Sequence, residues 1–191
     1  EGFANNPPER GYFCKTELFG KLKEIAGEQG FLNVADGANL DDTQEFRPGL
    51  QASRELNVRS PLKETGLTKK DIREVSKFLN LPNWDKPAYA CLSSRFPYGQ
   101  SITEEKLSMV SEAEKYLRAL GLIQFRVRHH ETIARIEVLP EDIHILTNSP
   151  VREELSAKFK NIGFTYVTLD LEGYRSGSMN EILSEIEQKI N

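Results

Sequence analysis

Hydrophobic residues in the first half of the chain follow helical spacing in two segments, with a strand-like run between them. The first segment repeats apolar residues every three or four positions and predicts a helix containing Leu18, Phe19, Leu22, Ile25 and Ala26. Residues 31–35 form a short apolar run that leads into Asp36 and Gly37, which is typical of a buried strand followed by a loop. Thr68 and Asp71 are spaced as a capping box, which predicts a second helix with a buried face of Ile72, Val75, Phe78 and Leu79.

The second half predicts the order helix, strand, strand, helix, strand, helix. Residues 125–128 and 134–138 alternate between apolar and charged side chains and therefore predict two strands. Residues 167–171 predict a third strand, and Ser178 with Glu181 is spaced to cap a last helix. Two further helices are indicated by the apolar sets Leu107, Val110, Leu117, Leu120 and Val151, Leu155, Phe159, Ile162.

These elements predict an α/β protein with two parts. Pro87, Pro97 and Gly99 interrupt the helical patterns shortly before residue 100, so we place the division between residues 1–97 and 98–191. The helix, strand, loop and helix of the first part form one slice of a parallel α/β layer. The second part has the size of a small α/β domain that folds on its own.

The composition is that of a globular chain, with 28% charged and 38% hydrophobic residues and a net charge of −4. No apolar run approaches the ~20 residues of a membrane span, and the first residues do not resemble a signal peptide. Cys14 and Cys91 are too few for a disulfide scaffold or a zinc site. We therefore expect a cytoplasmic protein without a metal site, and the acidic balance argues against nucleic-acid binding.

The two neighbouring strands of the second half carry the densest charged pattern. Alternation puts Arg126 and Arg128 on one face of their strand, and Arg135 and Glu137 on one face of the next. If the strands pair through a turn at 131–132, these groups converge, with His129 or His130 nearby. Guanidinium groups suit phosphate and carboxylate, so the pattern indicates an anion site. The alternative is a solvated face with weak cross-strand ion pairs.

Two other features are open to two interpretations each. Cys91 lies between Lys86 and Arg95, and neighbouring cations favour a reactive thiolate, but cysteine is also a common buried residue. Cys14, next to Lys15 at a helix start, is equally ambiguous. The segment 36–42 follows the first predicted strand, where α/β sheets bind ligands, but its polar residues also suit a simple turn.

Several long segments together resemble a known family. VADGANLDD, ACLSSRFPYG, RVRHHETIARIEV and TLDLEGYRSGSMNE, in this order, are similar to the ATP-dependent sulfur transferases of the adenylating PP-loop superfamily. The branch is the one that matures the nickel-pincer cofactor of lactate racemase. The resemblance implies that residues 1–97 are the remainder of a PP-loop domain with the adenine nucleotide alpha hydrolase-like fold. It also implies that residues 98–191 bind substrate and form a homo-oligomer.

The resemblance implies the following chemistry. ATP, with magnesium, activates a carboxylate of a pyridinium mononucleotide, and Cys91 then gives up its own sulfur. Arg126 and Arg128 match the family's basic strand and would bind the substrate's phosphate, and Arg175 is a weaker candidate for the same anion. Ser94 and Arg95, next to Cys91, would also bind the substrate and position it. Glu137 would assist proton removal or help bind a divalent ion. The nucleotide would lie near Asp36, Asn39 and Asp42.

The sequence departs from the family pattern in two ways. The Ser-Gly-Gly-x-Asp-Ser loop that holds the ATP phosphates is not found, so we expect a C-terminal portion or a truncated form. Some relatives hold an iron–sulfur cluster with three cysteines, but Gly11 takes the place of one of them, which disfavours a cluster here. The alternative functions are a PP-loop protein that binds nucleotides or thiolates tRNA, and a non-catalytic oligomeric piece.

Overall fold

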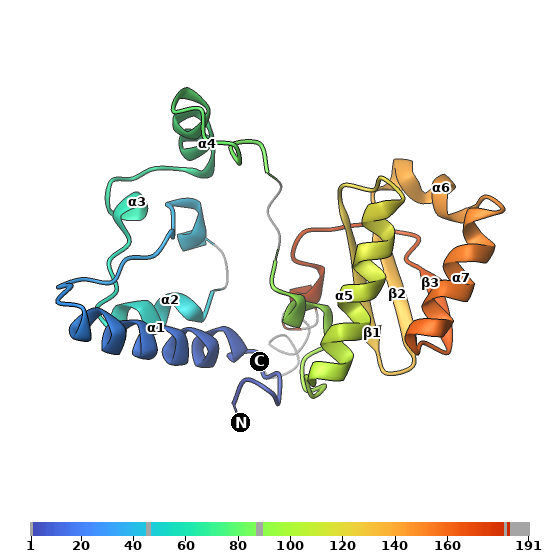
Figure 1. Cartoon of the computed structure of the whole chain (residues 1–191), viewed down its shortest axis with the longest axis horizontal. Coiled ribbons are helices and arrows are strands. Elements are labelled where there is room, and N and C mark those ends of the chain that lie inside the picture. The colour runs from blue at the N-terminus through green and yellow to red at the C-terminus, as the bar shows by residue number, and fades with distance from the viewer. Residues whose placement is uncertain (1, 45–46, 87–89, 182, 184–191) are drawn as a thin grey trace. The chain divides into compact units, whose positions relative to one another are not determined.

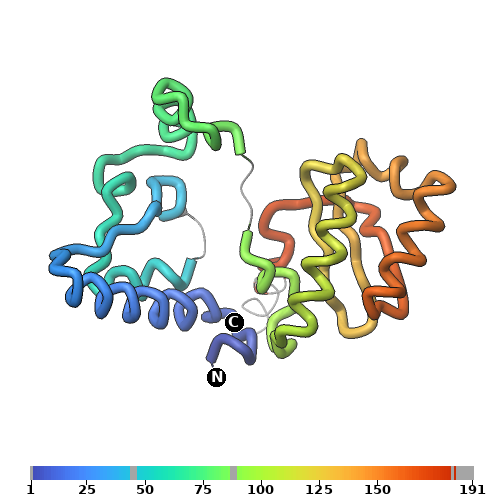
Figure 2. Tube along the Cα trace, in the orientation of Figure 1, coloured from blue at the N-terminus to red at the C-terminus, as the bar shows by residue number. Residues whose placement is uncertain are grey.

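The computed structural model describes residues 2–44, 47–86, 90–181 and 183. The chain forms two compact units, one of residues 1–3 and 7–88 and the other of residues 4–6 and 89–191. Residues 90–97, which we assigned to the first part, group with the second unit. Figure 1 labels the elements, and Figure 2 traces the chain through each unit. No helix in the described residues is long and apolar enough to cross a membrane.

The first unit is built from helices. These are α1 (Arg10–Glu28), α2 (Gly49–Glu55), α3 (Pro61–Glu64) and α4 (Lys69–Phe78), with a 3₁₀ turn at Asp41–Gln44. Helices α1 and α2 pack together where two glycines meet. A Cβ atom on Gly49 would lie 2.9 Å from Lys15 Cγ and 3.3 Å from the Gly11 carbonyl oxygen, so the helices approach closely only without side chains there.

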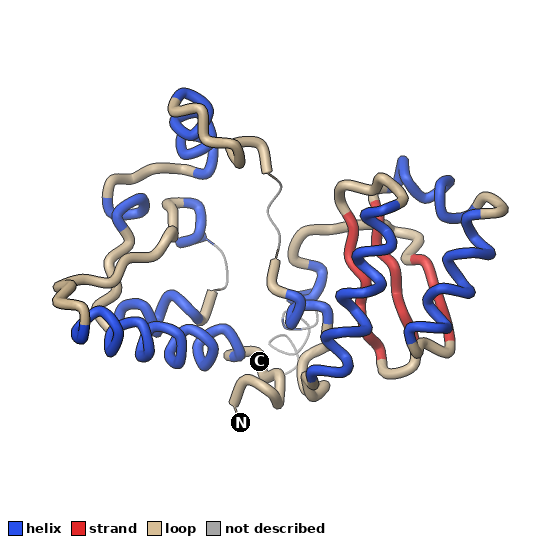
Figure 3. The backbone as a smooth tube through the Cα atoms, in the orientation of Figure 1, coloured by secondary structure: helices blue, strands red, loops and turns tan. Residues whose placement is uncertain are grey.

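The strand predicted at residues 31–35 is not formed. Ala35 makes a single parallel bridge to Arg59, through Asp36 N–H to the Arg59 carbonyl and Arg59 N–H to the Val34 carbonyl. Phe31 and Leu32 are exposed, at 64% and 96%. An apolar run becomes a strand only when neighbouring strands pair with it, and in the described part of this unit the pairing is limited to that bridge. Figure 3 shows strands in the second unit alone among the described residues.

Helix α4 confirms one prediction and corrects another. Thr68 and Asp71 form the expected capping box, in which each side chain accepts the other residue's backbone N–H. Val75, Phe78 and Leu79, however, are 49–84% exposed rather than buried. The capping box satisfies the helix terminus locally, so this helix forms without tertiary cover over its apolar face.

The second unit contains α5 (Glu104–Ala119), β1 (Phe125–His130), β2 (Ile133–Val138), α6 (Ile143–Thr147), α7 (Val151–Ile162) and β3 (Tyr166–Leu169). It follows the predicted order of elements as far as β3, with one additional short helix, α6, between β2 and α7. The sheet order is β1-β2-β3, with β1 and β2 antiparallel and β2 and β3 parallel. The third strand ends before Leu171, which is exposed. The predicted last helix falls largely outside the described residues.

The two faces of this sheet have opposite character. Helices α5 and α7 cover one face, and the core contains Val127, Ala134, Ile136, Val138, Leu117 and Phe159. Because side chains alternate along a strand, the residues between these core positions point to the other face. That face carries Arg126, Arg128 and His130 of β1 and Arg135 and Glu137 of β2. The protein is thus a mixed α/β chain, mostly helical, with a small mixed sheet.

Candidate functional site

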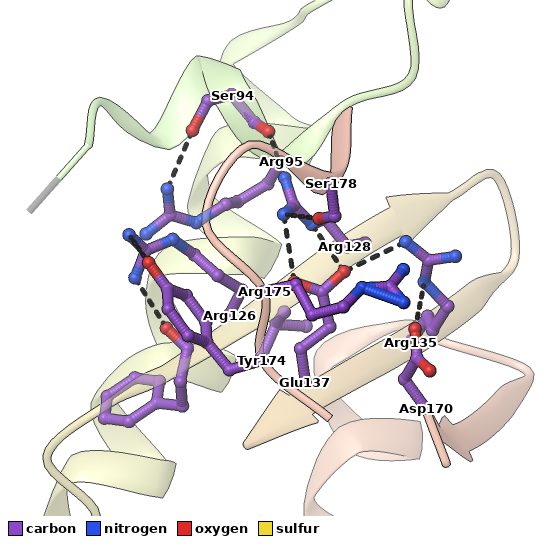
Figure 4. Close-up of polar contacts among 12 residues, drawn as sticks. Ser94, Arg95, Arg126, Arg128, Arg135, Glu137, Asp170, Tyr174, Arg175 and Ser178 are labelled. Carbon is purple, nitrogen blue, oxygen red and sulfur yellow. Dashed lines mark hydrogen bonds and ion pairs between the residues drawn. The ribbon is translucent and has the colours of Figure 1, made fainter. Parts of the chain in front are cut away.

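The polar face of the sheet is organised around Glu137. Its carboxylate is 1% exposed and accepts hydrogen bonds from Arg128 Nε and Nη2, both at 2.9 Å. Arg135 Nη2 donates to the same carboxylate at 2.9 Å, and Arg135 Nε lies 3.7 Å from Asp170. Figure 4 shows both guanidinium groups directed at Glu137 from opposite sides. One buried carboxylate therefore orients two arginines.

A cavity of about 170 Å³ opens beside this cluster. Its charged lining has three arginines, Arg128, Arg135 and Arg175, against one carboxylate, Glu181. The remaining lining residues are Ser94, Phe96, Pro97, His130, Ser178 and Met179. Burial lowers the pKa of His130, and the nearby charges of Arg135 and Arg128 lower it further, so the imidazole is neutral at neutral pH. Guanidinium groups that line a cavity suit an anionic ligand.

Residues 170–181, which follow β3 and which we call the covering segment, lie over part of the polar face. Tyr174 N–H donates to the Val138 carbonyl at 2.7 Å, and Ser178 Oγ accepts from Arg128 Nη2 at 2.9 Å. Arg175 lines the cavity and pairs with Glu172 and, at 3.1 Å, with Glu181. The segment therefore brings a third guanidinium to the two that the sheet supplies.

Arg126 lies on the same face as Arg128 but does not line the cavity. It is buried, and its Nη1 donates to the Phe125 carbonyl at 2.8 Å. Its Nη2 donates to the Tyr174 hydroxyl at 3.2 Å, and its guanidinium carbon lies 4.9 Å from the centre of that ring. Burial lowers the pKa of Arg126, and the charge of Arg95 adds to the effect. Arg126 therefore contacts the covering segment at Tyr174.

Cys91 is exposed and begins a 3₁₀ turn, Leu92–Arg95. Ser93 Oγ donates to the Cys91 sulfur at 3.2 Å, whereas Ser94 donates to the Cys91 carbonyl from its N–H at 2.9 Å and its hydroxyl at 2.7 Å. The exposed position fits a reactive thiol and not a buried structural one. Cys91 is not part of the cavity lining, but Ser94 is, and the Ser94 carbonyl accepts from Arg128 Nη1 at 2.7 Å. The cysteine turn thus joins the arginine cluster at Ser94.

Arg95 is held away from the cavity by a buried ion pair. Its Nε donates to Glu114 at 2.6 Å and its Nη2 at 3.1 Å, and the arginine side chain is 1% exposed. Its Nη1 donates to Ser94 Oγ at 2.8 Å and to the Cys91 carbonyl at 3.3 Å. Arg95 therefore contacts the turn that carries the cysteine, which makes its contribution to the site an indirect one.

The segment 36–42 lies in the first unit, beside a second cavity of about 230 Å³. Asp36 and Asp42 line it together with Lys15 and Arg47, and Asn39 does not. Asn39 donates to Asp42 from its backbone N–H at 3.1 Å and from its side chain at 3.0 Å. Arg47 lies 3.1 Å from the other Asp42 oxygen, so this carboxylate is already neutralised by a cation. Part of the segment therefore lines a polar cavity.

The described residues contain no group of three or more histidine, cysteine, aspartate or glutamate side chains that could hold a metal ion. Cys14 belongs to the first unit and Cys91 to the second, and both are exposed. Cys14 lies within α1, which begins at Arg10, and not at the helix start.

The sequence predicted some residues of the second unit's site and missed others. Strand alternation placed Arg135 in the predicted anion site with His129 or His130 beside it, although the family resemblance gave none of them a role. Ser93 gave no signal of its own, and Ser178 was expected only as a helix cap, whereas its hydroxyl accepts from Arg128. Glu114 could have been found, because it follows Val110 by four positions and precedes Leu117 by three, on the buried side of α5.

Comparisons with known proteins find three similar chains. A Synechocystis protein without an assigned function is 50% identical over 183 residues, which are 96% of this chain and 68% of that protein. The pyridinium-3,5-bisthiocarboxylic acid mononucleotide synthase of Lactiplantibacillus plantarum is 42% identical over 96% of this chain and 66% of its own length. A Methanocaldococcus jannaschii protein of unassigned function is 39% identical over 90% and 66%. The chain thus spans about two thirds of these relatives. No protein-family model matches it.

Proposed function

The chain belongs to the family of pyridinium-3,5-bisthiocarboxylic acid mononucleotide synthases, and we propose that it provides the sulfur donor and the substrate-binding cavity for such a reaction. One observation carries the proposal. The turn of the exposed Cys91 joins a cavity lined by three arginines, through the hydrogen bond between the Ser94 carbonyl and Arg128 Nη1. A thiol and an anion cavity in this relation suit sulfur transfer to a negatively charged substrate.

The arginine cluster suits a pyridinium mononucleotide that carries a phosphate and carboxylates. Arg128, Arg135 and Arg175 line the cavity, and their side chains are held in place by Glu137, Asp170, Glu172 and Glu181. A planar guanidinium binds such oxyanions through paired hydrogen bonds. Arg126 contributes indirectly in this proposal, because its guanidinium contacts Tyr174 and does not line the cavity.

The sulfur step follows from ordinary nucleophilic chemistry. ATP converts a substrate carboxylate to an acyl-adenylate and releases pyrophosphate. The Cys91 thiolate attacks the acyl carbon, the acyl–oxygen bond to AMP breaks, and a thioester forms. A base then removes the Cα proton of Cys91, the Cα–H electrons form the Cα–Cβ double bond, and the Cβ–S bond breaks. The sulfur leaves as the product's thiocarboxylate, and residue 91 becomes dehydroalanine.

Two residues beside the cavity are candidates for the proton acceptor. Glu137 is the one that the family resemblance indicates, but both of its oxygens already accept guanidinium N–H groups. His130 lines the cavity and is neutral because its pKa is lowered, so it is able to accept a proton. Glu137 then orients Arg128 and Arg135.

The cavity of the first unit is the proposed nucleotide site. Asp36 and Asp42 line it with Lys15 and Arg47, and Asn39 stiffens the loop through its two hydrogen bonds to Asp42. The cations suit phosphate groups of ATP, and the carboxylate of Asp36 suits a ribose hydroxyl or magnesium. Asp42 is a poor metal ligand here, because Arg47 lies against its carboxylate.

Substitution of the donor in the full-length protein tests the proposal. Cys91→Ala should abolish sulfur transfer to the mononucleotide, while ATP-dependent pyrophosphate release continues. Cys14→Ala, which removes the other exposed thiol, is the matched control and should retain transfer. Sulfur transfer by Cys91→Ala at the wild-type level would overturn the proposal.

A further inference from the structure

We infer that Glu114 is a positioning residue that fixes the Cys91 turn against the strand of the arginine cluster. The inference rests on the proposed role of Cys91 as sulfur donor. Glu114 lies on α5, contacts neither Cys91 nor the cavity, and acts through Arg95 and the backbone of β1.

Glu114 joins three parts of the second unit. It is 6% exposed, although it lies on a helix whose other acidic residues face solvent. Its Oε1 accepts from Arg95 Nε at 2.6 Å and from the backbone N–H of Val127 at 3.1 Å. Its Oε2 accepts from Arg95 Nη2 at 3.1 Å. One carboxylate thereby links helix α5, strand β1 and the cysteine turn.

These hydrogen bonds hold two parts of the proposed site, strand β1 and the cysteine turn. Val127 lies between Arg126 and Arg128 on β1, an edge strand of the sheet, so no strand among the described residues pairs with its N–H on that side. Arg95 in turn donates to the Cys91 carbonyl and to Ser94 Oγ. The distance between the cysteine turn and β1 is therefore determined at Glu114, on the core side of the sheet, and again at the hydrogen bond between Arg128 and the Ser94 carbonyl.

The ion pair between Arg95 and Glu114 is buried, and its burial indicates what the pair does. A buried ion pair returns little stability, because desolvation of both charges offsets their attraction, and apolar residues of similar size often serve as well. A pair of methionines would fill the space of Arg95 and Glu114, but it could not hydrogen bond to the Cys91 carbonyl or to Val127 N–H. The geometry points to placement of the turn as the role of the charged pair.

The test is single-turnover sulfur transfer in the full-length protein with Glu114→Gln. A displacement of the thiol by about 1 Å costs roughly 100-fold in rate, so transfer should slow by about that factor. Pyrophosphate release and KM for the mononucleotide should stay unchanged, because Glu114 touches neither substrate. Glu112→Gln is the matched control, since Glu112 is an exposed residue of the same helix paired with Lys115. An unchanged transfer rate in Glu114→Gln would overturn the inference.

A second variant separates positioning from folding. Arg95→Met combined with Glu114→Met should unfold at a temperature near that of the wild type and still transfer sulfur slowly. Recovery of the transfer rate along with stability would show that the pair is only structural and would overturn the inference. Failure of the proposed function has a different signature, namely sulfur transfer that persists in Cys91→Ala whatever residue stands at 114.

Discussion

Arg128 and Glu137 form a two-pronged ion pair diagonally across β1 and β2, with both N–O distances at 2.9 Å. The residue directly opposite Glu137 is Arg126, yet Arg126 turns to Tyr174 instead. Arg135 adds a further hydrogen bond to Glu137 from the same strand. The carboxylate therefore holds two of the three arginines that line the cavity, Arg128 and Arg135, while Arg126 contacts the covering segment.

Glu137→Ala should destabilise the second unit by about 3–5 kcal/mol, because it leaves the buried guanidinium of Arg128 without its counter-ion. Denaturant unfolding measures this loss. Glu172→Ala is the control, since Glu172 is an exposed carboxylate that also pairs with an arginine, and it should change the free energy of unfolding by less than about 1 kcal/mol. Equal effects of the two substitutions would contradict the central place of Glu137.

Arg128→Ala and Arg175→Ala should each weaken binding of the mononucleotide by about 1.5–3 kcal/mol, the range for hydrogen bonds to charged groups. Both side chains line the cavity. Isothermal titration measures the affinity, and added salt should lower it further in the wild type. Arg152→Ala removes an exposed arginine of α7 and should bind normally. Wild-type affinity in both cavity variants would mean that the cluster is a solvated strand face and not a binding site.

Arg126→Ala should also weaken mononucleotide binding, through the covering segment. Its side chain contacts Tyr174, the neighbour of Arg175, and does not line the cavity. If Arg126 acts only through Arg175, Arg126→Ala should have no further effect on affinity in an Arg175→Ala background. Full additivity of the two substitutions in the titration would instead indicate that Arg126 contacts the ligand itself.

Gly173→Ala should lower the unfolding temperature and weaken mononucleotide binding together. Gly173 has a φ of +72°, and a Cβ atom there would lie 2.7 Å from the Val138 carbonyl oxygen. The substitution therefore pushes the covering segment, with Arg175, off the sheet. Gly177→Ala is the matched control, because its φ is +82° but nothing lies within 4 Å of its Cβ position. It should show only the conformational cost of about 1 kcal/mol. Equal losses in both variants would contradict the close approach.

The two histidines of β1 should make the second unit less stable below neutral pH. Burial lowers the pKa of both His129 and His130 from 6.5. Well above pH 6.5 both residues are unprotonated in the folded and in the unfolded form. Below it the unfolded chain takes up protons first, so stability should fall as the pH drops from 6.5 toward the folded pKa values. Unfolding midpoints in denaturant at several pH values measure the slope.

Replacement of the two histidines should reduce this pH dependence. His129→Gln combined with His130→Gln should flatten the slope below pH 6.5, whatever its effect on stability at higher pH. His144→Gln, an exposed histidine on α6, should leave the slope as it is in the wild type. A slope that is unchanged in the double variant would mean that other groups cause the loss of stability.

Strand alternation correctly predicted the polar face of the sheet in the second unit. Period two places Arg126, Arg128 and Glu137 there, and the order of elements follows from the same pattern. The side chains' partners were not predictable, because they depend on segments distant in the sequence. Arg126 turns to Tyr174, 48 residues further along, and Arg95 to Glu114, whose spacing indicates a buried position on α5 but not its partner.

In the first unit one local prediction was confirmed and one strand prediction was wrong. The capping box of Thr68 and Asp71 formed as predicted, because all its partners are local. The strand at 31–35 did not form, since a strand depends on neighbours that the apolar pattern of one segment cannot supply. The resemblance of several long sequence segments nevertheless indicated the family, and the similarity to the Lactiplantibacillus plantarum synthase confirms it.

Sulfur donation by Cys91 is tested most directly by the mass of the Cys91 peptide after one turnover of the full-length protein with ATP and the mononucleotide. If Cys91 donates its sulfur, the peptide loses the mass of one hydrogen sulfide, in proportion to the thiocarboxylate formed. The Cys14 peptide, which carries the other exposed thiol, keeps its mass in the same sample. Thiocarboxylate formed with an unchanged Cys91 peptide would contradict the account.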